Sequence, residues 1–345
     1  MIEIIKMHLE KYPEMQIQDV AKLLYQSEFG GGHLISDANR SLERIKTEYE
    51  ALAEEDRRQS LKYENIGDGM YRVYLSCLSE DVSAEILNRM FVASANHRKG
   101  SIEGLEKKLE ACLKACELGE LPFLYDKMKN HFEEWKAEAY PAKSHTEIYR
   151  KNYHPAYRVM EEAYVSAIPY IKEIEEKQSK IIGIEGMCGA GKSTLGEVLH
   201  TVYPESNLFH ADDYFLQPHQ RTAERFAEVG GNLDRERMKE EIFDHLHDEN
   251  GITYRRFDCS KQELLEPVHI PYKDMVIIEG SYCQHPYFGE PYALKIFLQI
   301  SKEEQKKRII ARNGEKMWKR FEEEWIPKEL AYFEKYNIRA SVSVD

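Results

Sequence analysis

One short stretch constrains the fold of this chain more than any other: residues 186–193 read Gly-Met-Cys-Gly-Ala-Gly-Lys-Ser. The stretch matches in full the phosphate-binding loop, or P-loop, pattern G-x-x-x-x-G-K-[ST]. An apolar run of strand character, Ile181-Ile-Gly-Ile184, precedes it, and Thr194-Leu-Gly-Glu-Val-Leu199 can open a helix after it. The strand–loop–helix context that the motif requires is therefore present on both sides.

The residue types of this loop indicate what it binds. Glycines let backbone N–H groups close around phosphate oxygens, and the N-terminus of the following helix adds positive dipole. Lys192 is expected to reach the β- and γ-phosphates, and Ser193 to hold a magnesium ion. The predicted cofactors are therefore ATP and Mg²⁺. The predicted nucleotide-binding residues are Gly186, Cys188, Gly189, Ala190, Gly191, Lys192, Ser193 and Thr194.

The chain has 345 residues, which favours two domains. Up to about residue 178 apolar residues recur at three- and four-residue steps, as in helices, and only Tyr71–Leu75 fits a short strand or, equally, a buried helix. From about residue 179 strands and helices alternate, which predicts a parallel sheet covered by helices. We therefore expect a mostly α-helical domain over 1–178, ending in a connecting helix over 155–178, and an α/β P-loop domain over 179–345. The expected strands are 180–185, 207–210, 252–257, 275–279 and 294–300, and the expected helices are 192–202, 233–247 and 301–312.

Composition limits the partners and the location of the protein. A net charge of −13 argues against a general nucleic-acid or anionic-membrane binder. No apolar run approaches the roughly 20 residues of a spanning helix, and the N-terminus lacks the features of a signal peptide. The six cysteines form no C-x-x-C pair, which is typical of a reducing compartment. We expect a cytoplasmic protein with a small-molecule substrate and with neither nucleic acid nor membrane as partner; the sequence leaves the oligomeric state open, a homo-oligomer included.

Acidic residues follow two of the expected strands. Asp212 and Asp213 come after the strand 207–210, and Glu279 ends the strand 275–279. The carboxyl ends of parallel strands border the ligand crevice of such sheets. A hydroxyl that accepts a phosphoryl group needs a carboxylate to orient it and take its proton, and Asp212 is the candidate. Glu279 is expected to hold the magnesium ion together with Ser193 and Asp212.

A basic run near the C-terminus suggests a lid. Arg308, Arg312, Lys316 and Arg320 recur every four residues and share one face if the segment is helical, although Gly314 interrupts the run. Negative charge that develops on a transferred phosphoryl group is stabilised by mobile cations placed over it. Arg308 and Arg312 are therefore candidate catalytic residues, with a solvated surface face as the alternative.

Five segments together resemble a known family. They are the P-loop itself, Asp212-Asp-Tyr-Phe215, Gly230-Gly-Asn-Leu-Asp234, Ile278-Glu-Gly280 and Arg308-Ile-Ile-Ala-Arg312. The set resembles the uridine kinase and phosphoribulokinase group of P-loop kinases, which includes nicotinamide riboside kinases, over roughly residues 179–340. The resemblance implies a P-loop kinase domain, ATP-dependent phosphorylation of a small hydroxyl compound, and Asp212 as the catalytic base. It also suggests Asp213, Tyr214 and Asp234 as substrate residues.

The chain departs from uridine kinases where the base is read. Those enzymes carry a tyrosine and a following histidine; here Tyr254 matches the tyrosine, and Cys259 stands in the place of the histidine. A missing donor to the pyrimidine leaves polar groups poorly paired, so uridine is not the expected substrate. Arg255 and Arg256 suggest instead an acidic or phosphorylated acceptor, although arginines at a sheet edge paired with acids explain them equally well.

Rival functions differ in how they use Asp212. A kinase with a phosphoribulokinase-like or nicotinamide riboside kinase-like acceptor needs this carboxylate, whereas a nucleotide-sensing regulatory module whose helical domain binds a partner protein does not, so the residue favours an enzyme. The helical half could also be a second enzyme. Two of its segments, Glu28-Phe-Gly-Gly-Gly-His33 and Asn152–Arg158, could line a second site, or form a glycine turn and a helix start.

Overall fold

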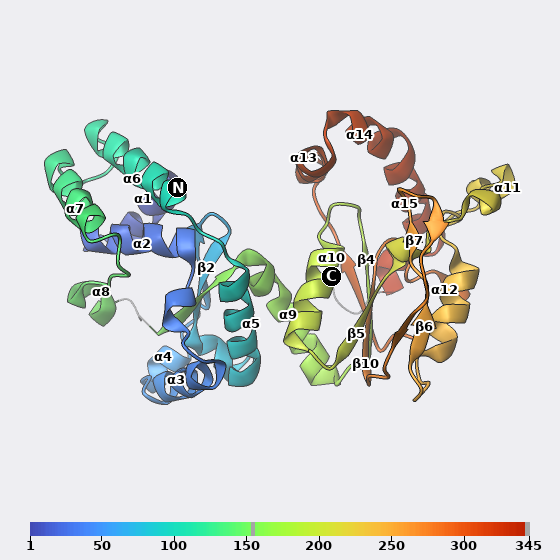
Figure 1. Cartoon of the computed structure of the whole chain (residues 1–345). Helices are drawn as coiled ribbons and strands as arrows, with labels where there is room; N and C mark the ends of the chain where they lie inside the picture. Colours follow the sequence, from blue (N-terminus) through green and yellow to red (C-terminus); the bar gives the residue numbers. More distant parts are fainter. Residues whose placement is uncertain (153–155, 342–345) are drawn as a thin grey trace. The chain divides into compact units, whose positions relative to one another are not determined.

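The computed structural model describes residues 1–152 and 156–341, and these residues form two compact units (Figure 1). The N-terminal unit is Met1–Ile168, and the C-terminal unit is Pro169–Asp345. The division lies inside the helix α9 (Glu162–Lys177), whereas the predicted domain boundary lies where this helix ends. Among the described residues, no helix is both long enough and apolar enough to cross a bilayer.

The N-terminal unit is built mainly of helices, as predicted, but it also contains a sheet. The strands β1 (Tyr63–Gly67), β2 (Met70–Tyr74) and β3 (Tyr157–Glu161) form an antiparallel sheet in the order β1-β2-β3. Its helices are α1 (Ile2–Lys11), α2 (Ile17–Phe29), α3 (Ala38–Glu50), α4 (Glu54–Arg57), α5 (Ala84–His97), α6 (Ile102–Glu117), α7 (Tyr125–Ala137) and α8 (Glu147–Asn152).

The strand β3 corrects part of the sequence interpretation. We expected a single connecting helix over 155–178, but the chain first adds β3 to β2, with Tyr74 opposite Tyr157 and Met70 opposite Glu161, and only then enters α9. Four of the five residues of β3 are buried. A short run that is buried throughout shows no alternation, so its periodicity cannot distinguish a strand from a helix.

The C-terminal unit is an α/β domain, as predicted. Its sheet has four parallel strands in the order β11-β4-β10-β5, and helices pack against it (Figure 1). Glu279 pairs with Ile184 on one side and with His210 on the other, so the carboxyl ends of three strands meet at one edge. The strands are β4 (Ile181–Gly186), β5 (Ser206–His210), β10 (Met275–Glu279) and β11 (Leu294–Leu298). The main helices are α10 (Lys192–Val202), α12 (Arg235–Glu241), α13 (Lys302–Asn313), α14 (Glu315–Arg320) and α15 (Ile326–Lys335).

The strand expected over 252–257 does not join this sheet. Instead β6 (Ile252–Tyr254) pairs antiparallel with β9 (Val268–Ile270), and β7 (Phe257–Asp258) forms a second hairpin with β8 (Glu263–Leu264). Strands of a parallel sheet are covered on both faces, whereas Thr253, Arg255 and Arg256 are exposed.

Candidate functional site: the P-loop and its surroundings

The P-loop connects β4 to α10, as the sequence predicts. Gly191 stands immediately before α10 with φ +100°, a conformation that strains any other residue. At Gly186, a side chain would collide with the backbone of Leu298 on β11. The amine of Lys192 lies across the loop and donates hydrogen bonds to the carbonyl oxygens of Gly186 (2.7 Å) and Met187 (3.2 Å).

A buried acid lies directly before the loop. Glu185 is fully buried at the end of β4, and burial raises its pKa to about 8, against the opposing effect of the positive charge of Lys192. Its Oε1 accepts a hydrogen bond from the N–H of Gly186 (3.2 Å), and its Oε2 accepts one from the hydroxyl of Tyr332 (3.3 Å). Nothing in the sequence singles out Glu185, because it continues an otherwise apolar strand.

Three polar side chains from different elements meet at the carboxyl edge of the sheet. Ser193 Oγ donates to Glu279 Oε2 (3.2 Å), and His210 Nδ1 lies 2.6 Å from Glu279 Oε1. The pairing of β10 with β5 places Glu279 beside His210. The hydrogen bond to Glu279 raises the pKa of His210. Glu279 thus contacts both the P-loop helix and the end of β5.

Asp212 and Asp213 follow β5 in a single turn of 3-10 helix, Ala211–Tyr214. The side chain of Asp212 is exposed. The neighbouring protein nevertheless raises the pKa of its carboxyl by desolvation, and the negative charge of Glu279 raises it further, while Lys192 acts in the opposite direction. Desolvation also raises the pKa of Asp213. The structure therefore brings Asp212, Glu279 and Lys192 together, although they lie far apart in the sequence.

The donor set at this edge fits a magnesium ion. Mg²⁺ prefers oxygen ligands and is usually held by one or two carboxylates, water and the phosphates of its nucleotide. Ser193, Glu279 and Asp212 offer a hydroxyl and two carboxylates. Among the described residues, no group of three or more His, Cys, Asp or Glu side chains could hold a metal ion by itself. The ion would therefore depend on the bound nucleotide for its remaining ligands.

The basic run is divided between two helices. Gly314, with φ +80°, ends α13 and precedes α14, so Arg308 and Arg312 do not share a helical face with Lys316 and Arg320. Arg308 Nη1 donates to the carbonyl of Gly189 in the P-loop (3.4 Å). Arg312 is exposed and donates to Asn313 Oδ1 (2.8 Å). Figure 1 shows α13 and α14 at the end of the sheet where the P-loop lies.

Two residues that sequence reasoning missed contact the P-loop directly. Glu329 on α15 accepts hydrogen bonds from the N–H of Cys188 (2.9 Å) and from the hydroxyl of Ser281 (2.8 Å), and it is buried. Gln305 on α13 donates to the carbonyl of Cys188 (2.8 Å). Both lie in amphipathic helices more than a hundred residues after the loop, where no local signal separates them from surface polar residues.

Two predicted substrate residues belong to a buried polar cluster around Arg237 on α12. The hydroxyl of Tyr214 donates to Glu241 (3.1 Å), and the Arg237 guanidinium lies 4.1 Å from the centre of the Tyr214 ring. Asp234 caps the N-terminus of α12, and its carboxylate accepts a hydrogen bond from Arg237 Nε (3.2 Å). Arg237 Nη2 also donates to the carbonyl of Asp213 (2.9 Å). The cluster therefore holds the segment that carries Asp213 in place.

The two arginines between β6 and β7 differ in their surroundings: one pairs with an acid, and the other lies near the aspartates. Arg255 Nε lies 3.6 Å from Glu241 Oε1, as expected of an arginine at a sheet edge. Arg256 is exposed, and its charge lowers the pKa of Asp213. Burial raises the pKa of the Cys259 thiol, and the charge of Asp212 raises it further. Arg256 and Cys259 therefore lie on the side of the two aspartates. Tyr254 is half-buried, with its ring edge-on to Phe209 at 5.3 Å.

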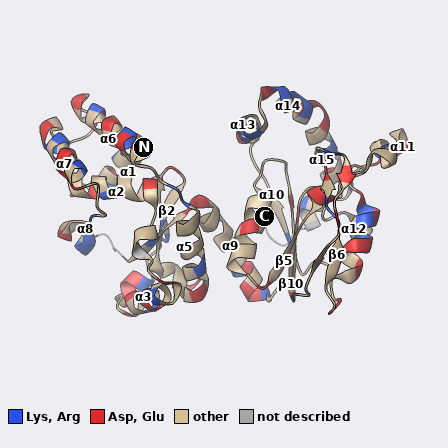
Figure 2. Cartoon of the chain, in the orientation of Figure 1, with Lys and Arg blue, Asp and Glu red and all other residues tan. Residues whose placement is uncertain are grey.

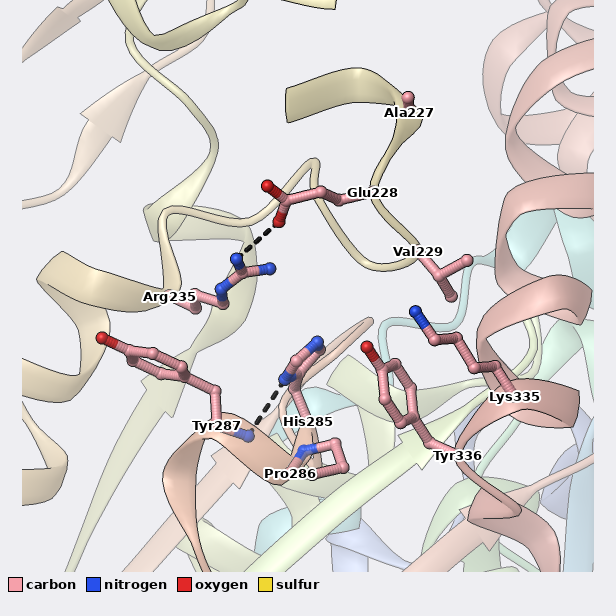
Figure 3. Close-up of a pocket in the computed structure, with 9 residues that line it drawn as sticks. All are labelled: Ala227, Glu228, Val229, Arg235, His285, Pro286, Tyr287, Lys335 and Tyr336. Atoms are coloured by element: carbon pink, nitrogen blue, oxygen red, sulfur yellow. Dashed lines mark hydrogen bonds and ion pairs between the residues drawn. The ribbon is translucent and has the colours of Figure 1, made fainter. Parts of the chain in front are cut away.

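A cavity of about 450 Å³ lies elsewhere in the C-terminal unit (Figure 3). Arg235 is paired with Glu228 at its wall (2.5 Å), and the amine of Lys335 lies 5.1 Å from the centre of the Tyr336 ring. The cavity shares no residue with the P-loop or with the acids at the sheet edge, so it is separate from the predicted site. Its lining residues are Ala227, Glu228, Val229, Arg235, His285, Pro286, Tyr287, Lys335 and Tyr336.

Comparisons with known proteins place the similarity in part of the chain. No protein-family model matches it. Uridine-cytidine kinase C of Dictyostelium discoideum is 27% identical over 122 residues, which cover 35% of this chain and 27% of that protein. The alignment thus spans about a quarter of the length of this curated relative. A solved structure described as a possible uridine kinase from Bacillus stearothermophilus is 22% identical, with a TM-score of 0.37, and the match covers 48% of this chain and 86% of that one. The predicted resemblance to uridine kinases is confirmed over part of the chain.

Proposed function

We propose that the C-terminal unit is an ATP-dependent kinase that phosphorylates a hydroxyl group of a small molecule. The observation that carries the proposal is the meeting of Asp212, Glu279 and Lys192 at one edge of the sheet, next to a complete P-loop. A nucleotide-binding loop alone serves many functions. A carboxylate beside that loop supplies the base that a hydroxyl acceptor requires.

Each residue then has a distinct task. The backbone N–H groups of the P-loop hold the phosphates, and Lys192 leaves the carbonyls of Gly186 and Met187 to contact the β- and γ-phosphates. Asp212 orients the attacking hydroxyl and takes its proton. Arg308 and Arg312 move toward the transferred group and stabilise its negative charge. Ser193, Glu279 and Asp212 would hold Mg²⁺, which neutralises phosphate charge when bound.

Arg256 and Cys259, which lie near the two aspartates, suggest which class of compound accepts the phosphoryl group. Cys259 has no strong hydrogen-bond donor for a pyrimidine, and Arg256 places positive charge near Asp213. We therefore expect uridine and cytidine to be poor substrates. An anionic hydroxyl compound, such as a sugar phosphate, is expected to be better, because its charge is complementary to the exposed arginine.

A substrate panel tests the proposal. The full chain is incubated with Mg-ATP and a series of nucleosides, ribosides and sugar phosphates, and ADP release is measured. We expect at least one acceptor to stimulate ADP release, and a Lys192→Ala variant to abolish this stimulation. Tight ATP binding without stimulation by any acceptor would contradict the proposal and would favour a nucleotide-sensing module.

A further inference from the structure

The N-terminal unit encloses a charged cluster that the proposed kinase chemistry does not use. Arg72 on β2 is 0% exposed. Its Nη1 donates to Glu64 Oε2 (3.2 Å) and to the hydroxyl of Tyr149, and its Nη2 donates to Gln26 Oε1 (3.4 Å). Its Nε has no hydrogen-bond partner among the described residues. Burying a guanidinium is costly even when it is paired, and such buried charges concentrate at functional sites.

A second chain of hydrogen bonds joins this cluster. His145 Nδ1 lies 3.1 Å from Asp19 Oδ1, and its Nε2 lies 2.6 Å from the hydroxyl of Tyr157. Gln26 Nε2 donates to the same hydroxyl (3.0 Å). The His145 ring stacks on Tyr149 with a centroid distance of 4.2 Å. The helix α2, the strands β2 and β3 and the segment that leads into α8 are thereby fixed around one point.

Lys22 lies on the face of α2 that points to this cluster. Asp19 precedes it by three residues and Gln26 follows it by four, so the three side chains share one helix face. Lys22 is half-buried, and its amine has no hydrogen bond or ion pair with any residue that the structure describes. Burial lowers its pKa to about 8, and the positive charges of Arg72 and Arg150 lower it further.

Two residues with basic side chains, Arg150 and His33, lie near Lys22. Arg150 stands in the last turn of α8, directly after Tyr149, and is exposed. Figure 2 shows basic residues, in blue, on this helix. It too has no side-chain partner within the described part of the chain. The His33 ring lies edge-on to Tyr25 of α2, with a centroid distance of 5.4 Å. Desolvation lowers the pKa of His33, and the charge of Lys22 lowers it further. The Gly-Gly-Gly-His segment noted in the sequence therefore lies beside Lys22. The other noted segment lies partly outside the described residues, but Tyr157 from it belongs to the cluster.

The two carboxylates of the cluster are already occupied. Asp19 accepts hydrogen bonds from the backbone of Gln16 and from the backbone and hydroxyl of Thr146, in addition to its contact with His145. Glu64 accepts from Lys11, Tyr12, Tyr74 and Arg72. The negative charge of Asp19 acts on Lys22 but is outweighed by burial and by the charges of Arg72 and Arg150. Neither acid of the cluster forms an ion pair with Lys22 or Arg150 in the described part of the chain, although the whole chain carries a net charge of −13. Repulsion among cations held in this way is relieved when an anion binds between them.

We propose that the N-terminal unit binds an oxyanion, the phosphate or carboxylate group of a small molecule, between Lys22 and Arg150, with the charge of buried Arg72 behind it. The side chains that surround this position are polar or aromatic, which suits a ligand that is itself a small polar metabolite. The site is independent of the kinase proposal, because none of its residues belongs to the C-terminal unit.

Selective labelling with pyridoxal 5′-phosphate tests this site in the full chain. The unprotonated amine of a lysine attacks the aldehyde carbon, water leaves to give an imine, and borohydride reduces the imine to a stable secondary amine. At pH 8 we expect Lys22 to be labelled at least about tenfold faster than the exposed Lys151, because the lowered pKa of Lys22 leaves a large fraction of its amine unprotonated. Peptide mapping locates the label, so Lys22 is scored separately from Lys192 of the P-loop.

Competition by anions identifies the ligand class. Inorganic phosphate should slow the labelling of Lys22, with sodium chloride at equal ionic strength as the control. Protection by phosphate alone indicates a phosphate group, and protection by acetate as well indicates that carboxylates are accepted. The proposal is overturned if Lys22 reacts no faster than Lys151, or if neither anion slows its labelling.

Matched variants test the proposed ligands. Arg150→Gln should raise the phosphate concentration needed for half-protection by about tenfold, because one charge-assisted hydrogen bond is lost. Lys151→Gln removes the same charge from the neighbouring exposed position and should leave protection unchanged. Because both side chains are exposed, neither change should disturb folding. Equal effects of the two substitutions would show that Arg150 does not contact the anion.

Discussion

At the scale of single residues, Asp212 has the most specific role in the proposed reaction. The Asp212→Asn substitution keeps the shape of the side chain and removes the base, so turnover should fall by about 10²- to 10⁴-fold. ATP affinity should stay close to that of the unchanged protein. Steady-state kinetics with the best acceptor and calorimetry with ATP measure the two quantities. The matched control is Asp213→Asn; if it abolishes turnover and Asp212→Asn does not, the base is assigned to the wrong residue.

Glu185 predicts a pH dependence of stability. Burial raises its pKa from an ordinary value of 4.5 to about 8, so the folded protein binds more protons than the unfolded chain between these two pH values. Its contribution to the free energy of unfolding is therefore lost as pH rises through this window. Glu185→Gln, which cannot ionise, should melt at the same temperature as the unchanged protein at pH 4, below both pKa values. At pH 8 it should melt several degrees higher, because one pKa unit corresponds to about 1.4 kcal/mol.

Thermal melts across this pH range check the prediction for Glu185. The exposed Glu205→Gln serves as the control and should not change the pH dependence. A Glu185→Gln protein that melts lower than the unchanged protein at pH 8 would show that the ionised carboxylate stabilises the fold through its hydrogen bonds to Gly186 and Tyr332.

At the scale of elements, the contact of α15 with the P-loop predicts a change in nucleotide affinity. The carboxylate of Glu329 accepts the N–H of Cys188 at the loop that receives the phosphates. Glu329→Gln keeps an acceptor there and removes a negative charge, so the Kd for Mg-ATP should fall by about tenfold. Glu334→Gln, on an exposed position of the same helix, should leave the Kd unchanged. Weaker ATP binding in Glu329→Gln would mean that the charge is needed to shape the loop.

Whether a strand could be predicted from the sequence depended on how its residues are buried. The strands β4, β10 and β11 are mostly apolar because helices cover both faces of a parallel sheet. The sequence motif then located the P-loop, and the ends of the strands located the acids. The strands β1 and β3 were missed. Tyr63–Gly67 contains polar residues that serve a buried cluster, and Tyr157–Glu161 is too short and too buried to show a period.

The contacts that complete the site could not be read from sequence. Glu329, Gln305 and Arg237 reach the P-loop or the Asp213 segment only through tertiary packing. Nothing in their neighbouring residues distinguishes them from surface charges. The substrate roles assigned to Tyr214 and Asp234 rested on resemblance alone, and the structure holds both in the buried cluster around Arg237.

At the scale of the whole molecule, the C-terminal unit is expected to bind nucleotide by itself. It has a continuous core of its own, which includes Phe209, Ile278 and Phe297. A fragment that begins at Glu162 retains all of α9 and should bind Mg-ATP with a Kd within about twofold of that of the full chain. Calorimetry on both proteins checks this, with circular dichroism to verify that the fragment is folded. A folded fragment without affinity for ATP would show that the N-terminal unit completes the nucleotide site.

In the proposed reaction, the γ-phosphoryl group of ATP moves to a small hydroxyl compound bound beside Asp212. The most direct measurement uses ATP labelled in that group, the acceptor that most stimulates ADP release, and a protein concentration sufficient for a single turnover. We predict that the label appears in the acceptor with the unchanged protein, and much more slowly with Asp212→Asn although both bind ATP equally. Label that appears only in inorganic phosphate, or that reaches the acceptor equally fast with both proteins, would contradict the account.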